Sequence, residues 1–291
     1  MKVGIVGYGS IGQRHANNLR GLGHTVIFYD PLVPNEIDRE TGIYFSDVEA
    51  VVIATPSMFH EGPLRACIER GKHVLIEKPI STSIGMLPQM LDAADEKGLV
   101  VMMGNNLRFH PCVLQAQNWL MQGLAGKPIW ANFICAQENA KYQDSVVLNW
   151  GAHEVDVAMH LFGPASVQCA SVTDDERIAD FVLLHESGVR SSFHLDYVTP
   201  VEIREAWIAC EDHNIGLDLL GRRISLGKWA QGLNGTYDDD YVTEAKAFVD
   251  RIGGKIGAGA TGRQGFDVLK VLLEVSAVAT YGAYPSFKVR S

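Results

Sequence analysis

The sequence predicts an α/β protein in which a doubly wound parallel sheet is followed by an α+β domain with an open, mainly antiparallel sheet. In residues 1–110 short apolar runs alternate with helical patterns, which is typical of parallel strands covered by helices on both faces. After Pro111 long runs of alternating polarity follow one another and helices are grouped apart, which favours an antiparallel sheet. We therefore expect two domains, residues 1–110 and residues 111–291.

In the first domain, buried-type strands alternate with helices. The strands are expected at Lys2–Gly7, His24–Asp30, Ala50–Thr55, His73–Glu77 and Leu99–Met103, and the helices at Ser10–Gly21, Pro63–Arg70 and Ser83–Lys97. Gly71 and Gly98 follow the last two helices, where glycine commonly ends a helix. The stretch between Asp30 and Val51 is too short for a full crossover helix, but it has room for a small strand at Ile43–Phe45.

The second domain begins with a helix at Val113–Gln122, which Gly123 ends. Its strands are expected at Ile129–Gln137, Ser166–Thr173, Phe181–Glu186, Val189–Tyr197, Ala206–Asp218 and Arg223–Leu226, and its later helices at Asn149–Phe162, Val242–Ile252 and Gln264–Tyr281. Ser187-Gly188 predicts a hairpin turn. In the second arm of this hairpin one face carries Val189, Ser191, Phe193, Leu195 and Tyr197.

Composition excludes several classes of protein. The 47% apolar content of the 291 residues excludes intrinsic disorder. Acids outnumber bases 34 to 25, and without a basic stripe we expect neither a nucleic-acid nor a membrane partner. The five cysteines are odd in number and form no C-x-x-C pair, which fits a reducing, cytoplasmic location. We expect no signal peptide, and the apolar stretch Val268–Tyr284 is interrupted by Lys270 and Glu274, so we expect no membrane span.

Gly7-Tyr8-Gly9-Ser10-Ile11-Gly12 forms a G-x-G-x-x-G motif between the first strand and the first helix. In this context Gly7 permits the tight turn, Gly9 lets the backbone approach a pyrophosphate, and Gly12 allows close packing of helix on strand. The phosphates then lie at the helix N-terminus, where free N–H groups favour anions. The motif predicts a dinucleotide site in a Rossmann domain, and a plain strand–helix turn is the alternative.

Asp30 ends the second expected strand, 18 residues after Gly12. A carboxylate at this place accepts hydrogen bonds from the adenosine ribose and repels a 2′-phosphate. It favours NAD over NADP as the cofactor, unless Asp30 serves only to begin a turn before Pro31.

Several blocks follow in order along the chain: the opening GxGxxGxRH, the strand-end ATPxxxH of Ala54–His60, the GKHVLIEKP of Gly71–Pro79, the segment Gly104–Pro111 and the GxHxxDxxxxLFG of Gly151–Gly163. Together they resemble the glucose–fructose oxidoreductase / inositol dehydrogenase / MocA (Gfo/Idh/MocA) family over nearly the whole chain. The resemblance implies an NAD(P)-dependent oxidoreductase of sugars, inositols or nucleotide-linked sugars. It also implies an α/β second domain whose open sheet forms the interface of a homodimer or homotetramer.

The resemblance implies roles for matching positions. In the family the lysine of EKP lies beside the nicotinamide and the reacting carbinol, so Lys78 is implied to be catalytic. Lys78-Pro79 is a candidate cis peptide bond. Further cofactor contacts are implied at Ala54, Thr55, Pro56, His60, Glu77 and Asn106. His60 would lie near the nicotinamide ribose, or it would simply cap the helix that follows.

Asn149, His153, Asp156 and His160 share one face if residues 149–162 form a single helix. His153 is the natural general base, because histidine titrates near neutral pH. Relatives often carry an aspartate where this chain has Asn149, and an amide can neither act as a base nor stabilise an imidazolium. Asp156 could orient His153 instead. Two alternatives are a metal site made by His153, Asp156 and His160, which we do not expect, and a buried structural histidine.

Substrate contacts are expected from five residues: Asn106, Arg108, Asn149, Trp150 and His153. Arg108 could hold an anionic group or merely pair with an acid, and Trp150 could contact a sugar ring or pack in the core. Catalysis would involve Lys78, His153 and Asn149.

The expected function is hydride transfer between NAD and a secondary alcohol or ketone of a sugar, an inositol-like polyol or a nucleotide sugar. The alcohol would lie between the nicotinamide and the helix of His153, which would remove the hydroxyl proton while Lys78 polarises the oxygen. Two alternatives remain. One is an epimerase or internal redox enzyme with tightly bound NAD, and the other is a non-catalytic NAD-sensing regulator of the same fold.

Overall fold

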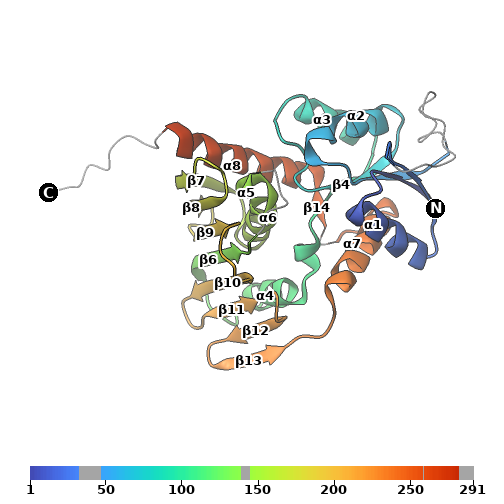
Figure 1. Ribbon diagram of the computed structural model, residues 1–291. Coiled ribbons are helices and arrows are strands. Elements are labelled where there is room, and N and C mark those ends of the chain that lie inside the picture. Colours follow the sequence, from blue (N-terminus) through green and yellow to red (C-terminus); the bar gives the residue numbers. More distant parts are fainter. Residues whose placement is uncertain (33–46, 139–144, 258, 282–291) are drawn as a thin grey trace. The chain divides into compact units, whose positions relative to one another are not determined.

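The computed structural model describes residues 1–32, 47–138, 145–257 and 259–281, and the chain divides into two compact units (Figure 1). The first unit comprises Met1–His110 and Gly235–Leu269, and the second comprises Pro111–Asn234 and the residues from Lys270 onward. The first change of unit falls after His110, where the sequence pattern changes. Residues 235–269, which the sequence assigns to the second domain, lie in the first unit instead.

The first unit is built on a six-stranded sheet with the strand order β14-β5-β4-β3-β1-β2. Its parallel strands are β1 (Lys2–Val6), β2 (Thr25–Tyr29), β3 (Ala50–Ile53), β4 (His73–Glu77) and β5 (Val101–Gly104), and β14 (Ala260–Thr261) pairs antiparallel with β5. The strand order reverses at β1, and the carboxyl ends of strands at such a point form the ligand crevice of open α/β sheets. The strand expected at Ile43–Phe45 lies outside the described residues.

Helices cover both faces of this sheet, as the sequence predicts (Figure 1). Helices α1 (Ser10–Gly21) and α7 (Tyr237–Ile252) lie on one face, and α2 (Glu61–Glu69) and α3 (Leu87–Glu96) on the other. Leu19 of α1 and Phe248 of α7 pack into one buried cluster with Ile5 and Leu75 of the strands. This shared apolar core explains why residues 235–269 belong to the first unit. Helix α3 begins at Leu87 rather than Ser83, because Gly85 has a positive φ of 41°.

The second unit is built on an eight-stranded sheet with the order β13-β12-β11-β10-β6-β9-β8-β7. Its strands are β6 (Pro128–Ala136), β7 (Ala165–Val172), β8 (Ile178–His185), β9 (Arg190–Asp196), β10 (Ile203–Cys210), β11 (Ile215–Asp218), β12 (Arg223–Leu226) and β13 (Trp229–Gly232). Within this sheet, as far as the structure describes it, β6 and β9 pair in parallel and every other pair of neighbours is antiparallel. The predicted hairpin at Ser187-Gly188 is confirmed, whereas the single strand expected at Ala206–Asp218 is wrong, because the polar run 211–214 turns the chain between β10 and β11.

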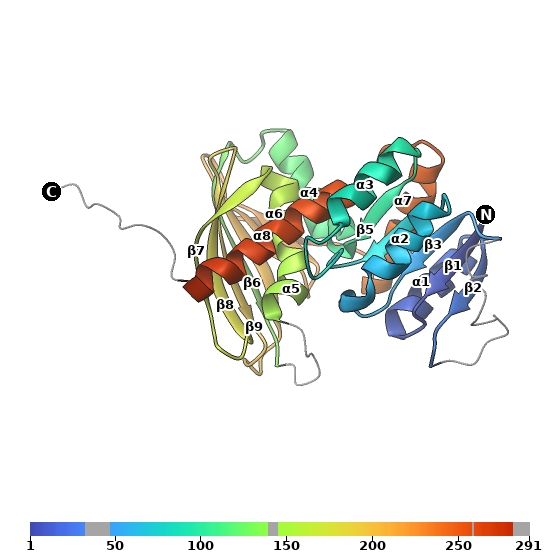
Figure 2. The same cartoon turned by 90° about the horizontal axis from the view of Figure 1, so that it is seen from above.

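One face of this sheet carries helices, and no helix of the described residues covers the other (Figure 2). The helices of this unit are α4 (Pro111–Met121), α5 (Val146–Asn149), α6 (Gly151–Phe162) and the part of α8 (Gly262–Tyr281) from Lys270 onward. The single helix expected at Asn149–Phe162 is divided at Trp150 into α5 and α6. Gly151 permits the close packing of α6, because a Cβ there would lie 2.9 Å from the Leu272 side chain. Among the described residues no helix is long and apolar enough to cross a membrane.

Replacing Phe248 by alanine should lower the free energy of unfolding of the first unit by about 3–5 kcal/mol, because it removes a fully buried ring from the core that α1 and α7 share. Urea denaturation followed by circular dichroism measures the change. The matched control is Lys246→Ala on the same helix, where the side chain is 61% exposed and the expected change is within about 0.5 kcal/mol. Equal losses in the two variants would contradict the packing of α7 on this sheet.

Candidate functional site

The glycine-rich turn between β1 and α1 is shaped by two close backbone approaches. Gly7 has a φ of 89°, and a Cβ there would lie 2.6 Å from the carbonyl oxygen of Ala54. A Cβ on Gly12 would lie only 2.0 Å from the carbonyl oxygen of Gly7. Both positions therefore require glycine, and α1 begins directly at the carboxyl end of β1.

Around Gly9 the turn leaves open space. A Cβ built on Gly9 meets no described atom within 4 Å, and this residue caps α1 without a side-chain hydrogen bond. The first turn of α1 holds no acidic residue, so the N–H groups at its start are suited to an anion such as a pyrophosphate. Ser10 and Ile11 belong to this first turn.

Two buried polar groups at neighbouring strand ends also suit a ligand. The Thr55 hydroxyl follows β3, and the Asn106 Nδ2 follows β5 in a short 3₁₀ helix (Asn106–Phe109). Within the described part of the chain neither atom makes a hydrogen bond, although both are buried. Because a buried polar group normally has a partner, these two atoms fit contacts with a bound polar molecule. Together with the space at Gly9, they make the residues present compatible with a dinucleotide.

Asp30 follows β2 and closes the turn. One of its carboxylate oxygens accepts a hydrogen bond from the Tyr8 backbone N–H at 2.7 Å, and the other accepts one from the Leu32 N–H at 2.8 Å. The Tyr8 ring stacks on Phe28 of β2 with the centroids 3.7 Å apart. A carboxylate can accept about four hydrogen bonds, so Asp30 retains capacity for ribose hydroxyls.

The ends of β3 and β4 are joined by a buried histidine. His60 is fully buried, and its two ring nitrogens lie 2.9 Å from the carbonyl oxygens of Pro79 and Thr55. Burial lowers the pKa of His60, although both carbonyl contacts oppose the shift. The Lys78-Pro79 peptide bond is cis, as expected. A neutral imidazole carries one N–H, so His60 donates to one of these two carbonyl oxygens at a time while its buried ring packs between them. Pro56 follows Thr55 at this turn.

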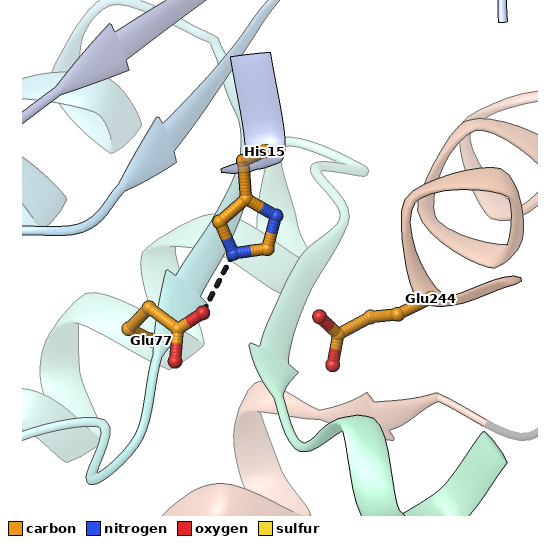
Figure 3. Close-up of side chains that lie close together, drawn as sticks. All are labelled: His15, Glu77 and Glu244. Atoms are coloured by element: carbon orange, nitrogen blue, oxygen red, sulfur yellow. Dashed lines mark hydrogen bonds and ion pairs between the residues drawn. The ribbon is translucent and has the colours of Figure 1, made fainter. Parts of the chain in front are cut away.

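Sequence reasoning missed a buried cluster beneath this turn, formed by His15, Glu77 and Glu244 (Figure 3). His15 of α1 donates from Nε2 to Glu77 Oε1 of β4 at 2.6 Å. Burial alone would raise the pKa of Glu77, but the hydrogen bond from His15 and the charge of Lys78 hold it below its usual value. Glu244 of α7 points at the same place, with all three groups within 4.8 Å. His15 and Glu77 lie in two of the sequence motifs, GxGxxGxRH and GKHVLIEKP, but neither motif indicates that the two side chains meet.

Arg108 follows β5 and is 3% exposed. Its Nη1 donates to Gln264 Oε1 of α8 at 3.1 Å. Burial among the residues of the first unit makes Arg108 part of the packing at this strand end, whereas Asn106 beside it keeps a buried amide nitrogen available.

The expected catalytic residues of the second unit lie together on α5 and α6. Asn149 donates from Nδ2 to the Tyr197 hydroxyl at 2.7 Å, and the Trp150 ring meets the Tyr197 ring edge-on at 4.5 Å. His153 is 7% exposed and Asp156 is fully buried. The sequence places Tyr197 on one face of its strand but gives it no role, because its approach to Asn149 depends on tertiary packing. In the structure Tyr197 is buried.

Comparison with known proteins agrees with this geometry. Residues 1–105 match the model of an oxidoreductase family, Gfo/Idh/MocA, with an NAD-binding Rossmann fold. The chain is 30% identical to an inositol 2-dehydrogenase of Mycolicibacterium gilvum over 71% of this chain and 65% of that protein. It is 25% identical to a scyllo-inositol 2-dehydrogenase (NAD+) of Bacillus subtilis over 65% of this chain and 60% of that protein. The matches thus span less than two thirds of either relative.

The fold of the chain is similar to that of a solved UDP-N-acetylglucosamine 3-dehydrogenase from Acidithiobacillus ferrooxidans. The TM-score is 0.84 at 21% identity, over 97% of this chain and 98% of that one. The match covers both units and supports a parallel-sheet domain followed by a mostly antiparallel one.

Gly9→Ala should fold like the wild type yet bind NADH about tenfold more weakly, because the new methyl group meets no protein atom among the described residues and fills the space over the turn. Gly12→Ala is the matched variant. It should lose about 2 kcal/mol or more of stability, because its methyl group collides with backbone. NADH fluorescence titration and thermal melting separate the two effects. Wild-type affinity in Gly9→Ala would contradict the placement of the phosphates.

Proposed function

We propose that this chain, which belongs to the Gfo/Idh/MocA oxidoreductase family, is an NAD-dependent dehydrogenase or reductase acting on a secondary alcohol or ketone of a sugar, polyol or nucleotide sugar. The observation that carries the proposal is the arrangement at the carboxyl edge of the first sheet. There the open turn at Gly9, the carboxylate of Asp30 and the lysine of the cis Lys78-Pro79 turn follow β1, β2 and β4. The names of the relatives in the comparisons support the substrate class.

The cofactor proposed for this edge is NAD rather than NADP. Gly7, Gly9 and Gly12 with the first turn of α1 would hold the pyrophosphate, and Asp30 would accept hydrogen bonds from the adenosine ribose. The negative charge of Asp30 opposes a 2′-phosphate at that place. Ala54, Thr55 and Asn106 would contact the other half of the dinucleotide, since they follow β3 and β5.

Bound NAD supplies the acceptor or donor of the hydride, and the side chains of this chain supply orientation and proton transfer. We assign to Lys78 the polarisation of the substrate oxygen, because an ammonium stabilises negative charge that develops there. We assign to His153 the removal of the hydroxyl proton in oxidation and its return in reduction. To Asp156, fully buried on the same helix, we assign the orientation of the His153 ring.

Asn149 takes a binding role in this proposal rather than a place in the proton path. Its amide donates to Tyr197, and its oxygen can accept a hydrogen bond from a substrate hydroxyl. Trp150 packs edge-on against the Tyr197 ring and so helps to position the Tyr197 hydroxyl to which Asn149 donates. An amide and a phenol without fixed charge suit a polyhydroxylated, neutral substrate.

The eight-stranded sheet provides the surface that we propose for self-association as a homodimer or homotetramer. Large apolar side chains are exposed on its strands, among them Trp130 of β6 and Trp207 of β10. No helix of the described residues covers that face (Figure 2). Exposed aromatic side chains of this kind mark association surfaces. We further propose that the protein works in the cytoplasm, since none of the cysteines among the described residues is in a disulfide.

A panel of inositols, sugars and sugar nucleotides, scored by NADH absorbance, should yield one class of substrate. Lys78→Ala should then lower kcat by at least about a hundredfold, because the substrate oxygen loses its charge partner, and leave NADH affinity within about threefold. Lys255→Ala, where the side chain is 70% exposed, is the matched control and should be fully active. Unchanged turnover in Lys78→Ala would refute the catalytic assignment.

Asn149→Asp should move the acid limb of the kcat/KM profile to higher pH, because a carboxylate at this place stabilises the imidazolium of His153. The Tyr197 hydroxyl can donate to the new carboxylate, so the packing is kept. Asn149→Ala removes the contact without adding charge and should leave the limb in place. Identical profiles for all three proteins would exclude His153 as the base.

The panel also separates the two alternatives. An enzyme with tightly held cofactor would release NAD on denaturation and turn over without net NADH. A regulator would bind NADH but turn over nothing, and Asn149→Asp would not change this.

A further inference from the structure

The buried acids beneath the Lys78 turn have no part in the mechanism above. Glu77 and Glu244 come from β4 and α7, and both face His15 (Figure 3). Glu244 is fully buried, and the Glu77 side chain is 13% exposed. Because placing charge in a protein interior is unfavourable, two carboxylates held together call for a specific reason.

The structure holds the Glu77 carboxylate in one position. His15 donates to it at 2.6 Å, and it lies over Gly104, where a Cβ would come within 3.3 Å of Oε1. A side chain at position 104 of the partner strand β5 would therefore displace this carboxylate by a few tenths of an ångström. His15 Nδ1 is buried and makes no hydrogen bond within the described residues, so the bond from Nε2 to Glu77 is the hydrogen bond that orients this ring.

The groups around the cluster show that its potential is negative. Burial, together with the charges of Glu77 and Glu244, raises the pKa of Tyr241, whose ring meets the His15 ring edge-on at 5.8 Å. The nearby guanidinium of Arg14 is paired with Asp238 at 3.0 Å. The contact with His15 and the charge of Lys78, the next residue in the chain, both lower the pKa of Glu77.

Glu77 lies at the carboxyl edge of the first sheet, where the nicotinamide half of a dinucleotide would bind. The proposed ribose contact at Asp30 follows β2, and the pyrophosphate would lie at the start of α1. A dinucleotide that crosses the switch point extends from there over the ends of β3, β4 and β5. Glu77 is the last residue of β4.

We propose that Glu77, positioned by His15 and supported by Glu244, makes the site discriminate between the two redox states of the cofactor. The nicotinamide ring carries a positive charge in NAD+ and none in NADH, so a fixed carboxylate near it favours NAD+ and Lys78 opposes this preference. Hydride transfer from the reduced ring to a ketone, with a proton to its oxygen, is thereby favoured. This inference rests on the proposed function, because it presumes that the dinucleotide binds at this edge.

The test is the ratio of the dissociation constants of NAD+ and NADH, which needs no substrate. Glu77→Gln keeps the shape of the side chain and removes its charge. It should weaken the binding of NAD+ on the order of tenfold more than the binding of NADH. For a two-electron couple a tenfold change in this ratio corresponds to about 30 mV. Lys78→Gln should move the ratio the opposite way, and the double variant should return it close to the wild-type value.

Asp250→Asn on the same helix as Glu244 is the matched control, since Asp250 pairs with Lys246 and Lys255 at the surface and should leave the ratio unchanged. His15→Gln, which keeps an N–H donor, should hold the ratio closer to wild type than His15→Ala does. Should Glu77→Gln fail to fold, Glu244→Gln carries the same prediction with a smaller shift.

Equal weakening of both nucleotides in Glu77→Gln would overturn the inference, because a loss of structure alone does not separate the redox states. An unchanged ratio would overturn it as well. A wild-type protein that binds neither nucleotide would refute the proposed function itself, which keeps the two failures apart.

Discussion

The first unit depends on the approach of the Gly12 backbone to the Gly7 carbonyl, where a Cβ would lie 2.0 Å away. This contact seats α1 directly on the end of β1 and leaves its first N–H groups above the switch point of the sheet. Because the helix is fixed there, His15 one turn further on reaches Glu77 at the end of β4. One steric constraint thus determines both the anion-binding end of the helix and the position of a carboxylate beside Lys78.

Residues 235–269, which follow the second unit's strands in the chain, belong to the first unit and add α7 to the surroundings of His15 and Glu77. Helix α7 places Phe248 in the core that α1 shares and brings Glu244 and Tyr241 to the His15 ring. A buried carboxylate is tolerated where hydrogen bonds and a nearby cation stabilise it, and His15 and Lys78 supply both for Glu77. His60, braced between Thr55 and Pro79, gives the lysine turn a second fixed support. Lys78 therefore follows the end of β4, which contacts from α1, α7 and His60 hold in place.

The sequence predicted those features of the fold that depend on a few neighbouring residues. The glycine motif, the strand ends and the hairpin at Ser187-Gly188 each follow from a few neighbouring residues. The cluster of His15, Glu77 and Glu244 joins residues from distant parts of the chain, so no spacing rule identifies it. Periodicity likewise placed Tyr197 on the same face of its strand as Phe193 and Leu195 but could not show that it meets Asn149, since that contact depends on how α5 packs on the sheet.

The neutral pair of Asn149 and Tyr197 in the second unit supports the proposed substrate class. In the first unit the buried carboxylate of Glu77 lies beside a lysine, an arrangement suited to a cofactor whose charge changes. In the second unit Asn149 and Tyr197 form a neutral pair, and the Arg204 guanidinium is held by Glu154 at 2.8 Å. Hydroxyl groups of a substrate would find a hydrogen-bond donor and acceptor at the neutral pair, whereas an anionic group would find no positive charge in it. These two side chains therefore support the neutral sugar or polyol that we propose over a sugar acid.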